Sequence, residues 1–227
     1  MNIVPSRVFS ELYIIIDCIF LLILGALLFT SRRRRALLFG LFGGVLYFIV
    51  DYGIFYLALG ARVVEGAPTA PFLFWLSMSY GFTNFAWIYL MLDKDKYRVE
   101  WSVFIFFYWI AEALLSENFG SSWSTISISR TTTSYHGVMA LILIVGYLIL
   151  IIENIYFKKN INIIYILFIG ITVQLGWETA LFVTGIRQSG IETLIINSLI
   201  ETNLGLPYIY HIHAYINKHF GKEKRLE

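Results

Sequence analysis

Residues 10–35 read SELYIIIDCIFLLILGALLFTSRRRR, a long apolar run that ends in four consecutive arginines. A hydrocarbon core of about 30 Å is crossed by a helix of roughly 20 predominantly apolar residues. Arginine is strongly disfavoured inside that core, so the block at 32–35 marks the end of the crossing. This stretch predicts a membrane-spanning helix, and the rest of the chain repeats its pattern.

The composition of the whole chain supports the same interpretation. Of its 227 residues, 58% are hydrophobic and 14% are charged, whereas a soluble domain has about 25% charged residues. Cys18 is the single cysteine, so no intramolecular disulfide can form. We therefore expect an integral membrane protein without a soluble catalytic domain, whose partners include the lipid bilayer.

Seven apolar segments can be drawn as membrane helices. They cover residues 10–30, 36–60, 71–92, 99–116, 135–156, 161–186 and 191–217. The sequence thus predicts an all-α, polytopic bundle of seven transmembrane helices that forms one domain over residues 1–227.

The basic residues between these segments indicate an orientation. Thirteen fall on one side and four on the other: residues 32–35, 94, 96, 98, 158, 159, 218, 222, 224 and 225 against Arg7, Arg62, Arg130 and Arg187. Loops rich in Lys and Arg tend to stay in the cytoplasm. We expect the N-terminus outside and the C-terminus in the cytoplasm, in a bacterial cytoplasmic membrane or, in a eukaryote, the endoplasmic reticulum.

Four of the predicted spans carry an acid away from their ends: Asp51, Glu112, Glu178 and Glu201. An acid at the centre of a membrane helix costs about 2.5 to 3.5 kcal/mol on insertion scales, so it usually faces the bundle interior. At a rise of about 1.5 Å per residue, all four fall in the middle to outer half of the membrane. Any single one can serve only as a hydrogen-bonding contact between helices. Together they predict a polar pocket that opens toward the outer leaflet.

Other side chains at similar depths extend the predicted pocket. Desolvation and neighbouring acids favour a neutral carboxyl group, which can act as a general acid, and aromatic faces attract cationic centres. We expect Asp51 and Glu201 to be catalytic. The expected substrate-binding residues are Asn84, Glu112, Trp177, Glu178, Asn203, Tyr52 and Tyr208. Acids among aromatics suit a shielded carbocation, and equally a bound organic cation.

Two further features of the pattern lead to narrower predictions. Pro207 cannot donate to the carbonyl of Asn203, so we expect a kink in the last span that frees this carbonyl toward the pocket. Asp17 lies near the end of its predicted span, where solvation explains an acid, and it is assigned no role.

Several chemistries have no motif in the chain. No His, Cys or acid residues stand at a convincing metal-ligand spacing, and His211 and His213 fall on different faces of a helix. There is no phosphate-cradling glycine loop and no aspartate-rich motif for a diphosphate-bound magnesium. We expect no metal, no cofactor and no nucleic-acid partner.

The layout of the chain resembles the small seven-span integral-membrane terpene cyclases of meroterpenoid and indole-diterpene pathways, the paxilline-type family, which has bacterial relatives. In that family a basic cluster follows the first span, and a catalytic Glu follows about twenty residues later in an Asn-x-x-Trp-Glu context. Here SRRRR is followed by Asp51 in YFIVDYGIFY, and Glu201 takes the place of the family's second catalytic acid, an Asp. The stretches TNFAWIYLML and GWETALFVTGIR are also similar.

The resemblance implies a membrane-embedded terpene cyclase. One buried acid would protonate an epoxide or alkene of a hydrophobic, prenylated small-molecule substrate, and aromatic faces would shield the carbocation. Asp in place of Glu at 51, without the preceding Trp, and Glu in place of Asp at 201 imply a different pocket depth and substrate.

Two other functions fit the same residues. A seven-span transporter or receptor would bind a small cationic or proton-coupled ligand in the acidic pocket, and an interrupted last helix is typical of transport sites. No three-plus-three repeat supports a carrier. A structural membrane subunit would use the acids only for helix assembly. The oligomeric state is not predicted.

Overall fold

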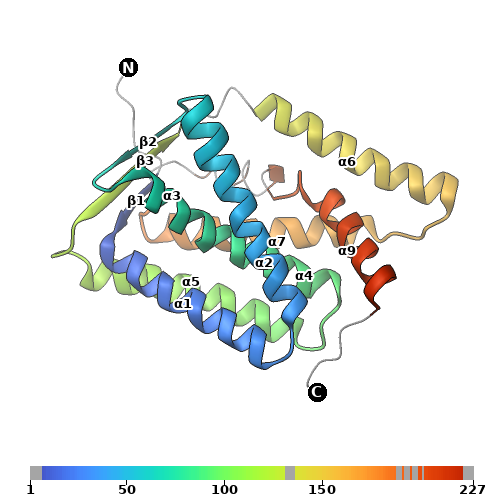
Figure 1. Ribbon diagram of the computed structural model, residues 1–227, viewed down its shortest axis with the longest axis horizontal. Coiled ribbons are helices and arrows are strands. Elements are labelled where there is room, and N and C mark those ends of the chain that lie inside the picture. Colours follow the sequence, from blue (N-terminus) through green and yellow to red (C-terminus); the bar gives the residue numbers. More distant parts are fainter. Residues whose placement is uncertain are drawn as a thin grey trace.

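The computed structural model describes residues 7–130, 136–187, 191, 195, 199–200 and 202–221, and only the backbone of residues 130 and 136. The described chain is predominantly helical, with one small sheet (Figure 1). Its helices are α1 (Glu11–Thr30), α2 (Arg34–Phe48), α3 (Thr69–Ser77), α4 (Thr83–Leu92), α5 (Arg98–Phe119), α6 (His136–Phe157), α7 (Ile163–Val183) and α9 (Leu206–Phe220). Two π-helical segments, η1 (Ile49–Ala58) and η2 (Met78–Phe82), continue α2 and α3. The strands are β1 (Arg7–Ser10), β2 (Arg62–Glu65) and β3 (Thr125–Arg130).

Five helices are long and apolar enough to cross a membrane: Glu11–Thr30, Arg34–Ala58, Arg98–Phe119, Gly137–Phe157 and Ile163–Val183. Many of their large apolar side chains are exposed, as expected for side chains that contact lipid. This confirms the coarse prediction of a helical membrane protein. The count of seven and the orientation stay predictions.

The two remaining expected spans have a different form. The third is divided into α3, η2 and α4, which follow one another without a gap from Thr69 to Leu92. The last one contains α9, whose 15 residues make about 22 Å of helix, which is less than the hydrocarbon thickness.

Local side-chain chemistry sets two of the helix starts. The Ser10 hydroxyl accepts from the backbone N–H of Tyr13 at 3.3 Å and caps α1. The Asn162 side chain accepts from the N–H of Tyr165 at 2.9 Å and caps α7. Such caps satisfy N–H groups that have no partner within the helix.

The sheet was not predicted, because its segments fall in the expected loops. Its order is β1–β3–β2, and both pairs are antiparallel. The N–H of Val8 donates to the Ile186 carbonyl at 2.9 Å, and Arg7 forms an isolated bridge with Arg187. The segment that follows α7 therefore pairs with β1, at the edge of the sheet. The sheet thus gathers four chain segments at one end of the helices, on the left of Figure 1.

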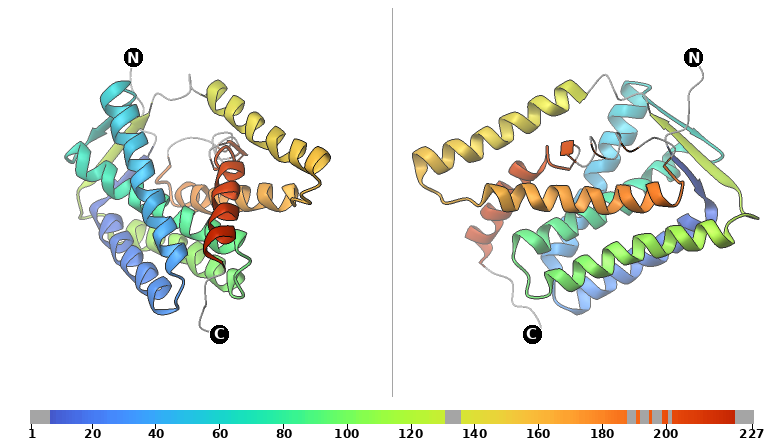
Figure 2. Two further views of the ribbon diagram at one scale, coloured as in Figure 1. Left: turned by 45° about the vertical axis from the view of Figure 1, so that its right-hand side comes forward. Right: turned by 180° about the vertical axis from the view of Figure 1, so that it is seen from behind.

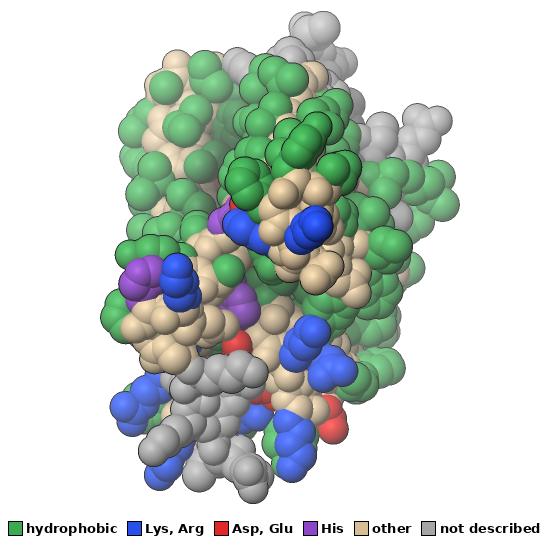
Figure 3. All heavy atoms as spheres, turned by 90° about the vertical axis from the view of Figure 1, so that its right-hand side faces the viewer, with side chains coloured by type: hydrophobic (Ala, Val, Ile, Leu, Met, Phe, Trp, Pro, Cys, Tyr) green, Lys and Arg blue, Asp and Glu red, His purple; other side chains and the backbone are tan. Residues whose placement is uncertain are grey.

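The opposite end carries the more basic loops. Arg33, between α1 and α2, pairs with Asp95, between α4 and α5, through Nε–Oδ2 and Nη2–Oδ1 distances of 2.9 and 3.0 Å. The Asn217 amide of α9 donates to Asp93 at 3.0 Å. Figure 3 views this end, where Lys and Arg side chains gather in the middle and lower part. The described members of the two predicted sets of basic residues therefore lie at opposite ends of the helices.

Glycines bring α2 against its neighbours. A Cβ at Gly43 would overlap the Phe85 ring of α4, and one at Gly44 would overlap Met78 of η2. Small residues of this kind let helix backbones approach closely in membranes. In contrast, α6 is the least buried candidate span and lies apart from α2 in both views of Figure 2.

Candidate functional site

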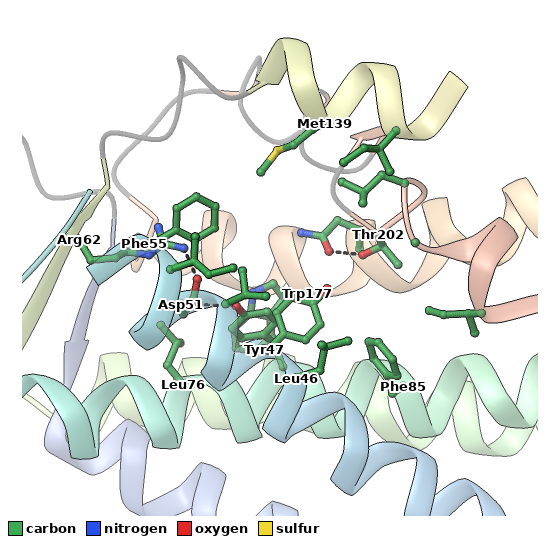
Figure 4. A pocket seen from close by; sticks show the side chains of 18 of the residues that line it. Leu46, Tyr47, Asp51, Phe55, Arg62, Leu76, Phe85, Met139, Trp177 and Thr202 are labelled. Carbon is green, nitrogen blue, oxygen red and sulfur yellow. Dashed lines mark hydrogen bonds and ion pairs between the residues drawn. The ribbon is translucent and has the colours of Figure 1, made fainter. Parts of the chain in front are cut away.

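A cavity of about 550 Å³ lies between the sheet and the middle of the bundle. Its lining residues come from α2, η1, α3, η2, α4, α6, α7, α9, the sheet and the turn at 202–205, with Leu59 just after η1. Most of them are apolar. Figure 4 shows Met139 of α6 on one side of the cavity, facing Tyr47 and Trp177 on the other.

Asp51 supplies the carboxylate of this cavity. It is 3% exposed, and it accepts from the Arg62 guanidinium at 2.5 Å and from the Tyr80 hydroxyl at 2.8 Å (Figure 4). A carboxylate held by a guanidinium in a charge-assisted hydrogen bond is strongly stabilised. The described hydrogen-bond partners of Asp51 are therefore a guanidinium and a phenol, not the other acids that the sequence placed at the same depth.

The two partners Asp51 and Tyr80 both lie in π-helical segments, η1 and η2. Such segments are rare and occur frequently at functional sites. The wider turn changes where a side chain points relative to an ordinary α-helix, so a sequence pattern with a period of 3.6 residues does not predict it.

A second ion-paired cluster forms the wall behind the cavity. Glu178 of α7 pairs with Arg7 of β1, at 3.3 Å, and with Arg187. The Gln174 amide also donates to Glu178 at 3.3 Å, and Gln174 in turn accepts from the Thr202 hydroxyl at 2.5 Å. These contacts hold β1, α7 and the turn before α9 together.

Aromatic rings surround the Asp51 end of the cavity. The Tyr80 ring lies 4.6 Å from that of Tyr47 and 6.2 Å from that of Trp177, measured between centroids. Trp177 is itself in edge contact with Trp109 at 5.2 Å. Tyr47, Phe55, Tyr80 and Trp177 all line the cavity, so aromatic side chains border its carboxylate.

The structure brings only some of the predicted site residues together. Asp51 and Trp177 line the cavity. Glu178 lies behind its wall, held by two arginines. Glu201 lies outside the described residues, immediately before Thr202, which lines the cavity.

The other predicted residues on the first five helices lie in helix packing. Glu112 is buried against α1 and accepts from the Tyr13 hydroxyl at 2.8 Å. Asn84 is 1% exposed, and neither of its amide atoms has a hydrogen-bond partner within the described part of the chain. The Tyr52 ring stacks on neighbouring rings of its own helix. None of the three is among the cavity-lining residues of the described chain.

Asn203 and Tyr208 connect α6 to the last segment. The Tyr147 hydroxyl of α6 donates to the Asn203 side chain at 3.0 Å, and the Tyr208 hydroxyl donates to the Ile142 carbonyl at 3.0 Å. The predicted free carbonyl of Asn203 is wrong, because that oxygen accepts from the N–H of Leu206 at 3.3 Å. Pro207 stands in the first turn of a new helix, a position where its missing N–H costs nothing.

Asp17 also differs from its prediction. It is fully buried rather than solvated, and it accepts from the Trp75 indole at 2.8 Å and the Ser79 hydroxyl at 3.0 Å. These contacts tie α1 to α3 and η2, so Asp17 serves the packing of the first helix.

Sequence reasoning missed the partners of the acids. Arg7, Arg62 and Arg187 were used only to assign an orientation, yet each pairs with an acid at the sheet end. A usable signal was present: Arg62 follows Asp51 by 11 positions and Arg187 follows Glu178 by 9, so each arginine is within reach of its own helix's acid.

Comparison with known proteins assigns the chain to no family. No protein-family model matches the chain, and neither a curated protein nor a solved structure matches it. The function must therefore be inferred from the cavity and its residues.

Proposed function

We propose that this chain is a membrane-embedded enzyme that cyclises or isomerises a prenylated, lipid-like molecule by acid–base chemistry in the cavity. One observation carries the proposal: a mainly apolar, aromatic-lined chamber has a hydrogen-bonded carboxylate and phenol at one end. Its volume of about 550 Å³ lies within the range of roughly 300 to 1,000 Å³ that is usual for small-molecule sites.

The surroundings of Asp51 suggest separate roles for the two predicted catalytic acids. Asp51, held by Arg62 and Tyr80, suits a base or an electrostatic stabiliser better than a proton donor. In the proposed reaction Glu201 gives its proton to an epoxide oxygen or an alkene carbon. A carbon–carbon bond then closes as the positive charge moves along the chain, and the final proton passes from carbon to Asp51.

The aromatic rings support a cationic intermediate. The rings of Tyr47, Tyr80 and Trp177 border the cavity near the carboxylate. A cation over such a face gains roughly 0.5 to 2 kcal/mol, more when water is excluded.

The surface around the cavity supports entry of the substrate from the lipid phase. Some lining residues are also exposed, and so mark where the cavity reaches the surface: Leu46, Ile54, Leu59, Val138 and Ile142. All of these are apolar and lie on or next to α2, η1 and α6. A prenyl chain dissolved in the bilayer would pass this rim without exposure to water.

The opposite end favours a chamber over a transport path. Of the described residues that line the cavity, none belongs to the basic loops. At that end a buried ion pair joins the α1–α2 and α4–α5 loops through Arg33 and Asp95. A carrier would need a second opening there.

The test is turnover by the purified protein in lipid nanodiscs, with prenyl and epoxyprenyl compounds as substrates and mass spectrometry of the products. We expect cyclised products from the wild type and at least about 100-fold less from Asp51→Asn and Glu201→Gln, since a positioned acid or base contributes about 10²- to 10⁴-fold. Glu100→Gln is the matched control, because this carboxylate is exposed at the start of α5. Proton-coupled solute uptake into proteoliposomes without turnover, or unchanged products in both acid variants, would overturn the proposal.

A further inference from the structure

The sheet presents two arginines to the cavity. In the antiparallel register Arg7 lies opposite Ile128, and Arg62 lies opposite residue 130, two positions further along β3. Residues two apart on a strand share a face, so both arginines lie on the face that carries Ile128. Arg7, Arg62 and Ile128 all line the cavity. The sheet therefore ends the apolar chamber with positive charge.

Both guanidiniums are deeply buried and keep unused donor capacity. Arg7 and Arg62 are each 8% exposed, and the Nε atom of each has no hydrogen-bond partner among the described residues. A guanidinium carries five N–H donors in a fixed fork. Leaving a buried donor without a partner is unfavourable, so a ligand that accepts from these groups is favoured.

The charges at this end do not balance within the described chain. Of the lining residues, Arg7, Arg62 and Asp51 carry a full charge, which gives two guanidiniums and one carboxylate. Arg7 shares its own partner, Glu178, with Arg187. Among the described residues that line the cavity, guanidiniums therefore outnumber carboxylates by two to one.

The shape of the cavity places this charge at the end of an apolar chamber. In Figure 4 Arg62 and Asp51 lie toward the sheet, while Leu46, Phe85 and Met139 extend away from them. A molecule with an anionic head and an apolar chain would satisfy both regions at once.

We propose that the cavity selects ligands with an oxyanion head group, a carboxylate or a phosphate, on a long apolar chain, and that Arg7 and Arg62 bind this head group. Arginine matches planar oxyanions with two parallel hydrogen bonds. The inference rests on the proposed function in one respect only: it names the chemical class of the substrate for the same cavity.

The test compares four molecules that share one farnesyl chain and differ in head group: farnesoic acid, farnesyl phosphate, farnesol and farnesylamine. Binding to the full-length protein in nanodiscs is measured by equilibrium dialysis. We expect the carboxylate or the phosphate to bind at least 10-fold more tightly than the alcohol, and the amine to bind most weakly. The comparison of the two anions tells a carboxylate site from a phosphate site.

Arginine variants test whether Arg62 and Arg7 cause the preference for an anionic head group. Arg62→Gln is expected to reduce the preference for the anion to less than about 3-fold, whereas Arg62→Lys should keep most of it. Because Arg62→Gln leaves Asp51 without its guanidinium, the charge-balanced double variant Asp51→Asn/Arg62→Gln is measured in parallel and should also lose the preference. Arg7→Gln should weaken anion binding in the same direction.

Equal affinity for the acid and the alcohol, preference for the amine, or full preference in all arginine variants would overturn the inference. The two proposals fail separately. Selective anion binding without product from any prenyl substrate rejects the enzyme and keeps the head-group site. Product formation without head-group selectivity rejects the head-group site and keeps the enzyme.

Discussion

The pair between Arg33 and Asp95 allows a quantitative test of how the end opposite the sheet is held together. The Arg33 side chain is 4% exposed and that of Asp95 is 0% exposed. Arg33 also lies over the rings of Tyr97 and Trp101, at 5.5 and 5.4 Å from their centroids. The change Arg33→Gln removes the guanidinium and leaves a buried carboxylate.

Breaking a buried ion pair by removing one partner costs about 3 to 5 kcal/mol. Asp95 keeps the backbone N–H of Tyr97 as a donor at 2.8 Å, so the lower end of this range is the expected loss. About 3 kcal/mol corresponds to more than 100-fold in the folding equilibrium, since each 1.4 kcal/mol is tenfold.

Lys159→Gln is the matched comparison, because it also replaces a cation by Gln within an ion pair. The Lys159 side chain is 52% exposed and lies 2.7 Å from Glu153. Exposed pairs contribute about 0.2 to 1 kcal/mol, so this variant should unfold almost like the wild type.

The assay is equilibrium unfolding in mixed micelles, with the denaturing detergent as the variable and helix content by circular dichroism as the signal. The double variant Arg33→Met/Asp95→Leu should recover most of the loss, because apolar replacement of a buried pair is often neutral or stabilising. The reasoning is refuted if Arg33→Gln destabilises the protein no more than Lys159→Gln does.

Two further predictions concern packing and orientation. Gly43→Ala is expected to lower the free energy of unfolding by about 1 to 3 kcal/mol, because the new methyl group overlaps the Phe85 ring; an unchanged thermal midpoint in nanodiscs contradicts the close approach of α2 and α4. The orientation can be tested with single cysteines in a Cys18→Ser background. Ser121→Cys should react with a membrane-impermeant maleimide added outside intact cells, whereas Lys96→Cys should react only after lysis. The reverse pattern rejects the orientation with the N-terminus outside.

The sequence predicted the helices well, since the length of an apolar run is itself the physical requirement for crossing a membrane. The expected start at 10 and end at 30 of the first span differ from Glu11–Thr30 by one residue at most. The expected span 99–116 became α5, Arg98–Phe119. The division of the third span by a π-helical segment was not predicted, because hydropathy does not depend on the width of a helical turn.

The candidate site was predicted less completely. Asp51 and Trp177 were placed in the pocket from depth alone, and both line the cavity. Depth did not distinguish them from Glu112, which faces α1 instead, since residues at one depth can point in any direction around a helix. Arg62 and Tyr80 were missed because the strand and the π-helical segments that aim them are set by tertiary contacts.

The order of the strands has a consequence for how the chain is made. Strands β1 and β2 do not pair with each other; both pair with β3, which is synthesised last of the three. Arg62 meets Asp51 within its own helical hairpin, but Arg7 needs Glu178, 171 positions later. A growing chain therefore leaves β1 and β2 without their strand partner until residues 125–130 have been made, and Arg7 without Glu178 until later still. Nascent chains stopped before residue 125 should expose both outer strands to protease.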